Sequence, residues 1–460
     1  MFNLQDERAE LLEKIEDYLN RKRYADLRDL LLPMEAADIA SLCKDLDEKV
    51  PLVFRLLPKE LAAEVFVELD SDEQEMLIDS FSNTELKEVL DELYLDDTVD
   101  IVEEMPANVV KRILRHCGPE MRKSINEILK YPEDSAGSIM TTEFVDLKAN
   151  MTVEDALKRI RRTGPDKETI NICYVIDEGR HLIGLLTIRT ILLSEEDDVI
   201  GDIMERNLIA VQTLDDQEVV ARALGKYDFL ALPVVDKENR LVGIVTVDDA
   251  IDVLQEEVTE DIEKMAAILP SDKPYLKTST LETYKARIPW LLLLMISATF
   301  TGQIIASFEN ALAAATILTA YIPMLMDSGG NCGSQASVTV IRGLSLGEIT
   351  FSDLFRVVWK ELRVAAVCGV TLAAANFVKL MLIDRMLFHN AMVTVPVAAV
   401  ICCTLVCTVI CAKLVGCTLP LLAKRVGFDP AVMASPFITT IVDAISLLIY
   451  FRFASAILGL

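Results

Sequence analysis

This 460-residue chain has few histidines and tryptophans and no cysteine pairs at the Cys-x-x-Cys spacing of metal sites. The scarcity of these residues argues against a site for a soft metal. It has three histidines and two tryptophans. No Cys-x-x-Cys pair and no Cys/His spacing typical of zinc occurs, so a soft-metal site is not indicated. Seven of the ten cysteines lie in the apolar part after residue 330, where cysteine serves as a small hydrophobic residue. The other three form no disulfide framework, which predicts a cytosolic front part.

Basic residues are also few, and no Gly-x-x-x-x-Gly-Lys-Ser/Thr loop for nucleotide hydrolysis occurs. The net charge is −27, from 45 Lys and Arg against 72 Asp and Glu. Residues 286–460 hold 11 basic and 8 acidic residues, so the first 285 carry 34 basic against 64 acidic. An acidic front part repels nucleic acid and attracts cations. Its junction with an apolar back part excludes a simple cytosolic enzyme.

Short helices are predicted for residues 1–130. Leu-Leu-Pro at 31–33 recurs at 56–58, and Met-Pro follows at 105–106. Each proline precedes an amphipathic stretch, and proline suits the first turn of a helix. A period near 25 residues predicts a helical solenoid, with an ordinary helical bundle as the alternative. The acids Asp96, Asp97 and Asp100 within it form either a solvated face or a cation-binding cluster.

A second repeat spans residues 137–254. Val-Ile-Asp at 175–177 leads to a Leu-Ile-Gly strand at 182–184, and Val-Val-Asp at 234–236 leads to Leu-Val-Gly at 241–243. The offset is 59 residues throughout, and each copy reads as strand, polar turn, strand and helix. This pattern resembles a tandem CBS module, which implies an α/β fold, pseudo-symmetric pairing and frequent nucleotide binding.

An acidic helix is predicted from Asp248 to about Ala267. Its apolar residues recur at spacings of three and four on one face. The rest of its surface carries aligned acids, and like charges one turn apart repel. We expect counter-ions there, with a merely soluble linker helix as the alternative. The acids aligned or clustered on it include Asp249, Asp252, Glu256, Glu260 and Glu263.

Five membrane spans are predicted after residue 286, since each segment offers about 20 largely uncharged residues. Basic residues gather in the linkers after the second and fourth spans, which predicts a cytosolic N-terminus and an external C-terminus. The predicted spans cover 288–308, 311–340, 364–383, 391–412 and 430–451.

Asp443 is the most informative residue of the back part. It lies near the middle of the last span with no basic residue within a turn. A charge there costs about 2.5–3.5 kcal/mol on insertion scales. Either it pairs with Lys379 or Lys413, or it faces a water-filled ion path, where oxygen ligands suit a hard divalent cation.

The second span carries a polar, glycine-rich segment at 327–335. Three glycines and several amides there predict unwound backbone lining a cavity. Close helix packing through small residues is the alternative.

Together these features resemble the MgtE family of magnesium channels and transporters. The most specific segments are PMLMDSGGNCGSQAS and DPAVMASPFITTIVDAISLLIYF. The resemblance implies a homodimeric Mg²⁺ channel with its pore between subunits and Asp443 as the selectivity carboxylate. The pore side would also include Asp429, Gly329, Gly330, Asn331 and Ser435. The implied sensing acids are Glu64 in the solenoid, Asp216, Glu218 and Asp228 in the CBS module, and Asp249, Asp252, Glu257, Glu260 and Asp261 in the acidic "plug" helix.

The chain departs from the family in its nucleotide pocket. Some members bind ATP in the CBS module through an Arg-Asp pair, whereas this chain has Arg189 followed by Thr190. A ribose-binding carboxylate is therefore missing, although Tyr174 and Phe229 remain available to line such a site.

We therefore expect a multidomain protein with four parts. These are a helical solenoid (1–130), an α/β tandem CBS module (131–254), an acidic plug helix and linker (255–285) and an all-α membrane domain of five helices (286–460). The expected function is Mg²⁺ transport in the plasma membrane, without catalysis, as a lipid-embedded homodimer closed by cytosolic Mg²⁺. A membrane-anchored nucleotide sensor and a carrier of Co²⁺ or Mn²⁺ are the alternatives.

Overall fold

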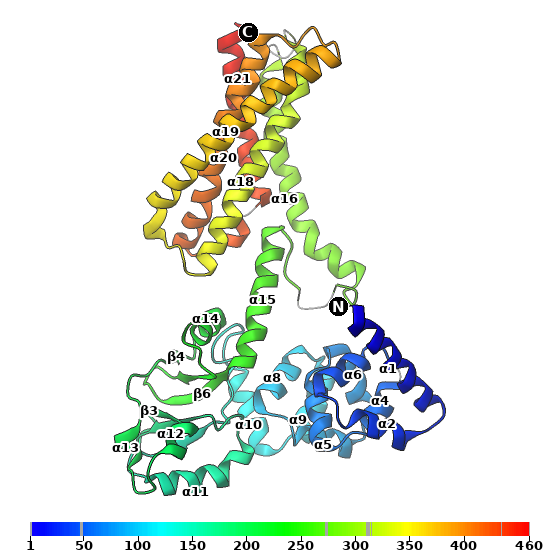
Figure 1. Ribbon diagram of the computed structural model, residues 1–460, viewed down its shortest axis with the longest axis vertical. Coiled ribbons are helices and arrows are strands. Elements are labelled where there is room, and N and C mark those ends of the chain that lie inside the picture. The colour runs from blue at the N-terminus through cyan, green and yellow to red at the C-terminus, as the bar shows by residue number, and fades with distance from the viewer. Residues whose placement is uncertain are drawn as a thin grey trace. The chain divides into compact units, whose positions relative to one another are not determined.

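The computed structural model describes residues 2–46, 49–271, 275–309, 313, 315–433 and 435–459 (Figure 1). The chain forms two compact units, Met1–Leu254 and Gln255–Leu460.

Residues up to 128 form short helices that stack in sequence order. Helix α3 packs against α5, α5 against α7, and α7 against α9, as in a solenoid. Pro58 and Pro106 lie at the N-caps of α5 and α9, next to the predicted first turn, whereas Pro33 lies two residues before Glu35, the N-cap of α3. The helices are α1 (Phe2–Asn20), α2 (Tyr24–Leu31), α3 (Ala36–Cys43), α4 (Val50–Phe54), α5 (Lys59–Val67), α6 (Ser71–Ser80), α7 (Asn83–Leu90), α8 (Leu95–Glu104), α9 (Ala107–His116) and α10 (Pro119–Ile128).

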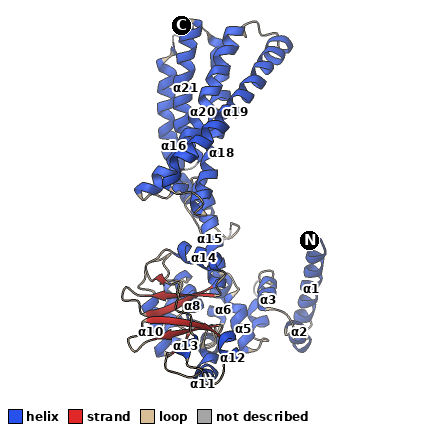
Figure 2. Cartoon of the chain, turned by 60° about the vertical axis from the view of Figure 1, so that its left-hand side comes forward, coloured by secondary structure: helices blue, strands red, loops and turns tan. Residues whose placement is uncertain are grey.

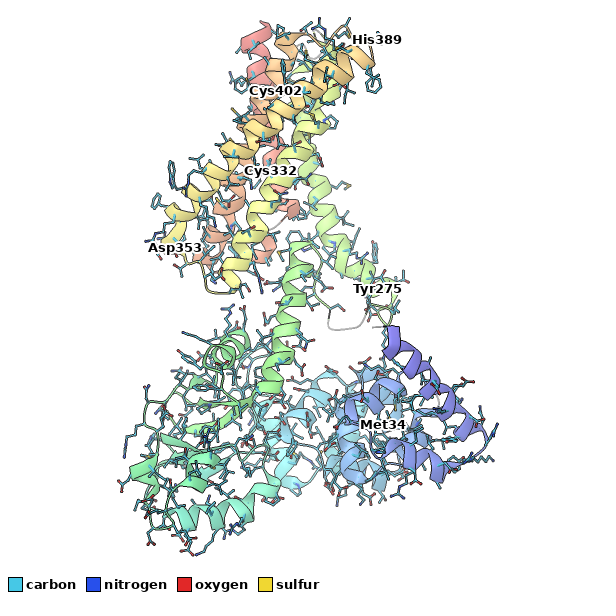
Figure 3. The ribbon with its side chains drawn as sticks, in the orientation of Figure 1. Met34, Tyr275, Cys332, Asp353, His389 and Cys402 are labelled. Atoms are coloured by element: carbon cyan, nitrogen blue, oxygen red, sulfur yellow. The ribbon has the colours of Figure 1, made fainter. Side chains whose placement is uncertain are left out.

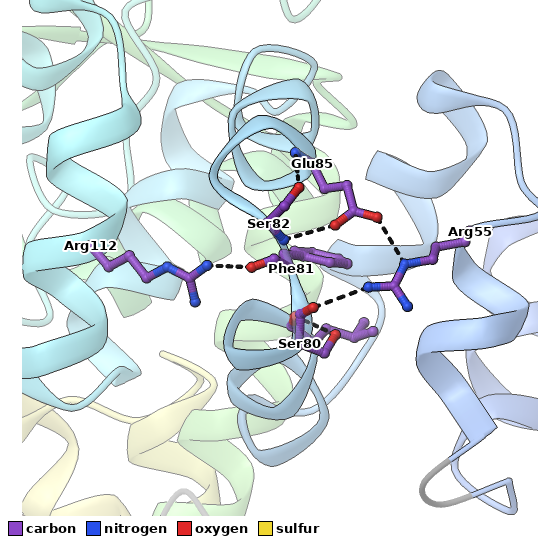
Figure 4. Close-up of polar contacts among 7 residues, drawn as sticks. Arg55, Ser80, Phe81, Ser82, Glu85 and Arg112 are labelled. Carbon is purple, nitrogen blue, oxygen red and sulfur yellow. Dashed lines mark hydrogen bonds and ion pairs between the residues drawn. The ribbon is translucent and has the colours of Figure 1, made fainter.

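Two arginines join neighbouring repeats of the solenoid at the turn between α6 and α7 (Figure 4). Arg55 donates to Glu85 over 2.8 Å and to the Ser80 carbonyl over 3.0 Å. Arg112 donates to the Phe81 carbonyl from the other side. The C-terminal carbonyls of a helix lack partners within the helix, so these guanidinium groups satisfy them. Ser82 and Glu85 then form a capping box that begins α7.

The CBS region consists of two copies of one three-stranded sheet (Figure 2). In each copy the first strand pairs in parallel with the second, and the second pairs antiparallel with the third. The register repeats with the predicted offset, because Val175 faces Gly184 and Val234 faces Gly243. The elements are β1 (Val145–Leu147), α11 (Val153–Thr163), a 3₁₀ turn (Gly164–Asp166), β2 (Ile172–Ile176), β3 (Leu182–Thr187), α12 (Ile188–Leu193), α13 (Ile200–Ile203), β4 (Val211–Gln212), α14 (Gln217–Tyr227), β5 (Ala231–Val235) and β6 (Leu241–Thr246).

The two sheets share one apolar core, which accounts for the pseudo-symmetric pairing. Tyr174 and Ile176 of β2 pack in the same cluster as Val235 of β5 and Ile244 of β6. The ring of Tyr174 meets that of Phe144 edge-on, with 6.0 Å between the ring centroids. Each repeat therefore buries its inner strands against the other.

Helix α15 (Val247–Met265) follows β6 and runs across the boundary of the two units at residue 254. The acidic helix predicted from the sequence is therefore one continuous helix. Its buried side chains are Ala250 and Val253. The predicted apolar face is largely exposed: Ile251 is 51% exposed and Ile262 is 58% exposed.

The second unit is a bundle of long helices built around α20, which packs against α18, α19 and α21 (Figure 1). Helix α16 presents Leu291, Met295 and Phe300 outward, as expected for a helix that contacts lipid. The elements are α16 (Thr280–Ser307), a 3₁₀ turn η3 (Thr316–Tyr321), α18 (Ile322–Ser345), η4 (Phe351–Asp353), α19 (Leu354–Lys379), a π-helical segment η5 (Leu380–Leu387), α20 (Val395–Val426), η6 (Pro430–Met433) and α21 (Ser435–Leu458).

Among the described residues, four helical segments are long and apolar enough to cross a membrane, whereas the sequence predicted five spans. These segments are Thr280–Ser307, Phe351–Leu387, Val395–Val426 and Pro430–Leu458. The predicted span that is not among them is the second, which corresponds to helix α18. It has 24 residues, but its polar glycine-rich segment makes it less apolar than the others.

The predicted break in the second span is wrong. Helix α18 continues without interruption through residues 327–335. Its glycines permit close contact with neighbouring helices: a Cβ atom added at Gly329 would lie 2.9 Å from Val442, and one at Gly330 would lie 2.9 Å from Thr439. The alternative explanation, helix packing through small residues, accounts for these glycines.

Candidate functional site

Asp443 lies in the middle of α21, in an apolar stretch. Its Oδ1 atom is buried and has no hydrogen-bond partner among the described residues. The charged group that acts on it is a second carboxylate, Asp327 of α18. A carboxylate partly removed from water, with no counter-charge among the described residues, is costly in an apolar setting. The arrangement is therefore one that a cation would stabilise.

Neither lysine weighed as a partner of Asp443 is available to it. Lys379 lies 2.9 Å from Asp384, which also accepts a hydrogen bond from the Tyr321 hydroxyl. Lys413 is buried and lies 3.5 Å from Glu361 of α19. Both ammonium groups are thus paired with other carboxylates. The alternative that Asp443 forms an ion pair with one of these lysines is therefore wrong.

A polar stripe runs along one exposed side of α18. Asp327, Asn331 and Gln335 recur at spacings of four, so they share a helix face, and all three are exposed. Cys332 is instead buried in the core of the bundle (Figure 3). A polar stripe facing lipid would be unfavourable, so this face needs water or protein beside it. Ser435 begins α21, and its side chain lies outside the described residues.

The last turns of α15 contact the ends of the long helices. Lys264 lies 2.7 Å from Asp429 and 2.5 Å from Glu260. Asp429 also accepts a hydrogen bond from the Ala431 amide over 2.8 Å. Loss of surrounding water and the nearby Asp429 raise the pKa of Asp261. The structure therefore brings together Glu260 and Asp261, predicted as acids of the plug helix, and Asp429, predicted separately on the pore side.

A second acidic cluster forms in the first unit. Asp96, Asp97 and Asp100 at the start of α8 lie within electrostatic range of Asp249 of α15. Burial, followed by repulsion from Asp97, raises the pKa of Asp96 to about 7. The pKa of Asp97 rises to about 7 and that of Asp100 to about 8, in both cases through desolvation and then repulsion from Asp249. The structure thus groups acids of the solenoid and of the plug helix in one cluster.

Sequence reasoning missed two members of this cluster, Glu143 and Glu168. Glu143 accepts a hydrogen bond from the Leu95 amide at the N-terminus of α8, over 3.4 Å. The Glu168 amide donates to the Glu143 carbonyl over 2.9 Å, which holds the two acids together. Burial and repulsion from Asp96 raise the pKa of Glu168 to about 9. Neither belongs to a run of acids in the sequence, so no local signal could have identified it.

The sensing acids predicted elsewhere are not part of this cluster. Glu64 is exposed on α5, and Glu68 is the acid at the end of that helix that acts on Asp97. Asp216 caps the N-terminus of α14 and Glu218 pairs with Arg222, whereas Asp228 lies at the other end of the helix. With 11 residues, α14 is about 16 Å long, so these three acids form no common site within one chain.

Among the described residues no group of three acidic, cysteine or histidine side chains has the geometry to hold a metal ion. The carboxylates of α8 and α15 therefore lie close enough to repel but not as a formed coordination shell. A hard cation such as Mg²⁺ keeps much of its water, so carboxylates can also hold it through that water.

The residues expected to line a nucleotide site lie on different elements of the CBS module, and Tyr174 is fully buried in the core between the two sheets. The Tyr174 hydroxyl is buried and has no hydrogen-bond partner among the described residues. Arg189 is exposed on α12, and Phe229 is partly buried and stacks on Tyr227. Thr190 shares a hydrogen bond with Thr187 over 2.9 Å, so its hydroxyl is already engaged.

Three known protein families match successive parts of the chain. A family described as a divalent cation transporter matches residues 322–453, the MgtE intracellular N domain matches 34–134, and the CBS domain matches 136–196 and 200–256. The order of these matches defines a transporter membrane domain behind two cytosolic modules.

Curated relatives match over nearly the full length. The magnesium transporter MgtE of Thermus thermophilus is 37% identical over 437 residues, covering 94% of this chain and 95% of the relative. The magnesium transporter MgtE of Bacillus subtilis is 33% identical over 452 residues, or 97% of each chain. This chain therefore belongs to the MgtE family.

A solved structure supports the fold of the front part. The crystal structure of the cytosolic domain of the Mg²⁺ channel MgtE in complex with ATP is 38% identical, with a TM-score of 0.50. It matches 53% of this chain and 99% of that structure.

Proposed function

We propose that this chain forms a homodimeric, Mg²⁺-selective channel of the cell membrane. Its relatives are named magnesium transporters, and its own membrane unit carries a carboxylate suited to a hard cation. The solenoid and CBS module would lie in the cytosol and the C-terminus outside. The basic residues at the ends of α18 and α20, Arg342, Lys424 and Arg425, favour that orientation because positive charge is retained on the cytosolic side.

One observation carries the proposal: Asp443 has no counter-charge among the residues that the structure describes. Two copies of Asp443 across a dimer axis would hold a partly hydrated Mg²⁺ through its water, since Mg²⁺ dehydrates reluctantly. The membrane potential supplies the driving force, about 4.6 kcal/mol for two charges at 100 mV. No hydrolysis step is required.

The polar stripe on α18 supports a permeation path beside Asp443. Asp327 acts on Asp443, and Asn331 and Gln335 continue the same exposed face. We assign the path to this stripe, including Asn331. Gly329 and Gly330 then bring α18 close to α21 and α20 rather than offering free carbonyls.

The acidic clusters support closure by cytosolic Mg²⁺. Carboxylates of α8 and α15 crowd together. Their pKa values are raised first by burial and then by mutual repulsion, and a divalent cation would neutralise that repulsion. A ligand that binds one of two states shifts the population toward it. Mg²⁺ would therefore favour the arrangement in which α15 is held by α8 and by the region around Asp429, which is the closed state. In this scheme Glu256 and Glu257 add to the plug charge.

Divalent flux into liposomes tests the function. Purified protein should admit Mg²⁺ down a potential, and the Asp443→Ala variant should not. If Co²⁺ or Mn²⁺ enters at the same rate as Mg²⁺, the protein is not selective for Mg²⁺ and transports divalent cations in general. The absence of any flux, with the protein folded and dimeric, would favour the membrane-anchored sensor.

A nucleotide at the CBS module is a second candidate, favoured by the unsatisfied Tyr174 hydroxyl. A purine ring nitrogen or amino group would supply its missing partner, with Phe229 beside the ring and Arg189 near the phosphates. Because Thr190 lacks a carboxylate, we expect weak ribose binding. Equilibrium dialysis with ATP tests this directly.

A further inference from the structure

Lys264 is the only basic residue of α15, a helix with eight acids between Asp248 and Glu263. It lies one residue before the end of the helix. A lysine near a helix C-terminus already interacts favourably with the helix dipole, and pairing with Glu260 one turn earlier adds little more. If only these two effects acted, the Lys264 side chain would lie on the surface of α15 with its ammonium group exposed to solvent.

The ammonium group of Lys264 reaches beyond its own helix. It lies 2.7 Å from Oδ2 of Asp429, which is in the loop between α20 and α21, and its side chain is 22% exposed. Asp429 is held in place because its other oxygen accepts a hydrogen bond from the Ala431 amide. The ion pair therefore joins α15 to a fixed carboxylate of the membrane unit.

Two further contacts surround this ion pair. Met265 packs against Ile341 of α18 and Ala431 of η6. Asp261 interacts with Ser345 at the end of α18. The end of α15 is thus seated on the helix ends by apolar contact, while its own acids face Asp429. Without a cation between them, Glu260, Asp261 and Asp429 would oppose that seating.

We propose that the Lys264 ammonium is a built-in cation that holds the end of α15 at the mouth of the ion path without Mg²⁺. The idea rests on the proposed function, in which α15 closes the channel. One ammonium against three carboxylates leaves two negative charges, which matches one divalent cation. Lys264 and Mg²⁺ therefore act together, and the lysine sets how much Mg²⁺ is needed for closure.

The test compares Lys264→Met, which keeps the length and apolar stem, with Lys264→Arg, which keeps the charge. Cysteines introduced at Met265 and Ala431 report the contact through a short bis-thiol crosslinker, with each single-cysteine variant as control. The linked peptide is identified by mass spectrometry on the full-length protein in EDTA. Mg²⁺ flux against cytosolic Mg²⁺ concentration is measured on the same variants without the added cysteines.

We expect crosslinking in EDTA to be about threefold slower with Lys264→Met and unchanged with Lys264→Arg, in keeping with a partly exposed ion pair. The Mg²⁺ concentration for half closure should rise about two- to fivefold with Lys264→Met. Unchanged crosslinking with Lys264→Met would overturn the proposal even if Mg²⁺ closes the channel. Closure of that variant at lower Mg²⁺ would also overturn it, because the lysine would then compete with Mg²⁺. If no variant conducts, the proposed function fails and the crosslinking result still decides the role of Lys264.

Discussion

Gly416 of α20 lies against the backbone carbonyl of Gly333 in α18, so closely that an added methyl group would overlap that oxygen. Gly333 in turn leaves 2.8 Å between an added Cβ atom and Ile438 of α21. The glycines of both helices therefore set the distance between α18, α20 and α21. That packing fixes where the polar stripe of α18 lies relative to Asp443.

Gly416→Ala should destabilise the membrane unit by about 1–3 kcal/mol, the usual cost of overpacking a close contact. Gly302→Ala in α16 is the matched control, because nothing lies within 4 Å of the position of its added Cβ atom. Thermal unfolding in detergent, followed by loss of dimer on size exclusion, measures both. Equal melting temperatures for the two variants would contradict the packing role of Gly416.

Much of the fold could be predicted from the sequence where a pattern repeats. The sequence repeat with its offset of 59 residues predicts both the strands and their pairing register. The pairs Val175–Gly184 and Val234–Gly243 are equivalent in the two copies. The continuous helix α15 also follows from its periodicity. The fate of the glycine-rich segment could not be predicted, because local propensity disfavours glycine in helices while close tertiary packing requires it.

The site was predictable only in part for a similar reason. Asp443 is conspicuous because an apolar span isolates it, and the acids of α15 are conspicuous because they accumulate. Glu143 and Glu168 are single acids that chain folding brings beside α8. Lys379 and Lys413 remained open as partners of Asp443 until their ion pairs with Asp384 and Glu361 were known.

Cysteine labelling should distinguish the two sides of α18. Asn331→Cys and Gln335→Cys lie on the exposed polar stripe, so water-soluble thiol reagents should modify them and Mg²⁺ should slow the reaction. The native Cys332 is buried next to them and should stay unreactive, which makes it an internal control. Modification is measured by mass spectrometry on the reconstituted protein. If Cys332 is labelled fast while cysteines at positions 331 and 335 stay unreactive, the permeation path lies on the opposite side of α18.

Metal-free protein should lose stability of its front part as pH rises. The pKa values of Asp97 and Glu168 are raised from 3.8 and 4.5 to about 7 and about 9. An acid with a raised pKa in the folded state contributes its full stability below the unfolded value and loses it as pH rises through the folded value. Protease resistance of residues 190–285 in EDTA should therefore fall between pH 5 and pH 9.

Mg²⁺ at millimolar concentration should restore that resistance, and most strongly at high pH, where the carboxylates are charged. Asp97→Asn should weaken both effects, whereas Asp79→Asn, an exposed acid of α6, should leave them unchanged. Replacing several plug acids by lysine should leave current less sensitive to cytosolic Mg²⁺. If protection by Mg²⁺ is absent and the charge-reversed channel still closes with Mg²⁺, the sensing role of these acids is wrong.

Thr190→Asp should tighten ATP binding, because a carboxylate accepts two ribose hydroxyl hydrogen bonds where the threonine hydroxyl is engaged with Thr187. An increase of about tenfold in affinity corresponds to about 1.4 kcal/mol. Thr190→Asn, which keeps the shape without the charge, is the control, and equilibrium dialysis is the measurement. Equal ATP binding by the native chain and both variants would exclude this pocket as the ribose site.

Asp443→Asn tests the core of the proposed function, since it keeps the shape of the side chain and removes its charge. The Oδ1 atom of Asp443 has no partner among the described residues, and Lys379 and Lys413 are paired elsewhere, so folding does not depend on this charge. The variant should therefore remain a folded dimer while Mg²⁺ flux falls at least about tenfold, because a neutral amide holds hydrated Mg²⁺ poorly. Glu309→Gln, an exposed acid between α16 and η3, is the control and should conduct normally. Flux is followed with an Mg²⁺ indicator inside liposomes at a fixed potential. Native flux and native preference for Mg²⁺ in Asp443→Asn would show that the carboxylate is not the filter, and the permeation path would then have to be sought away from α21.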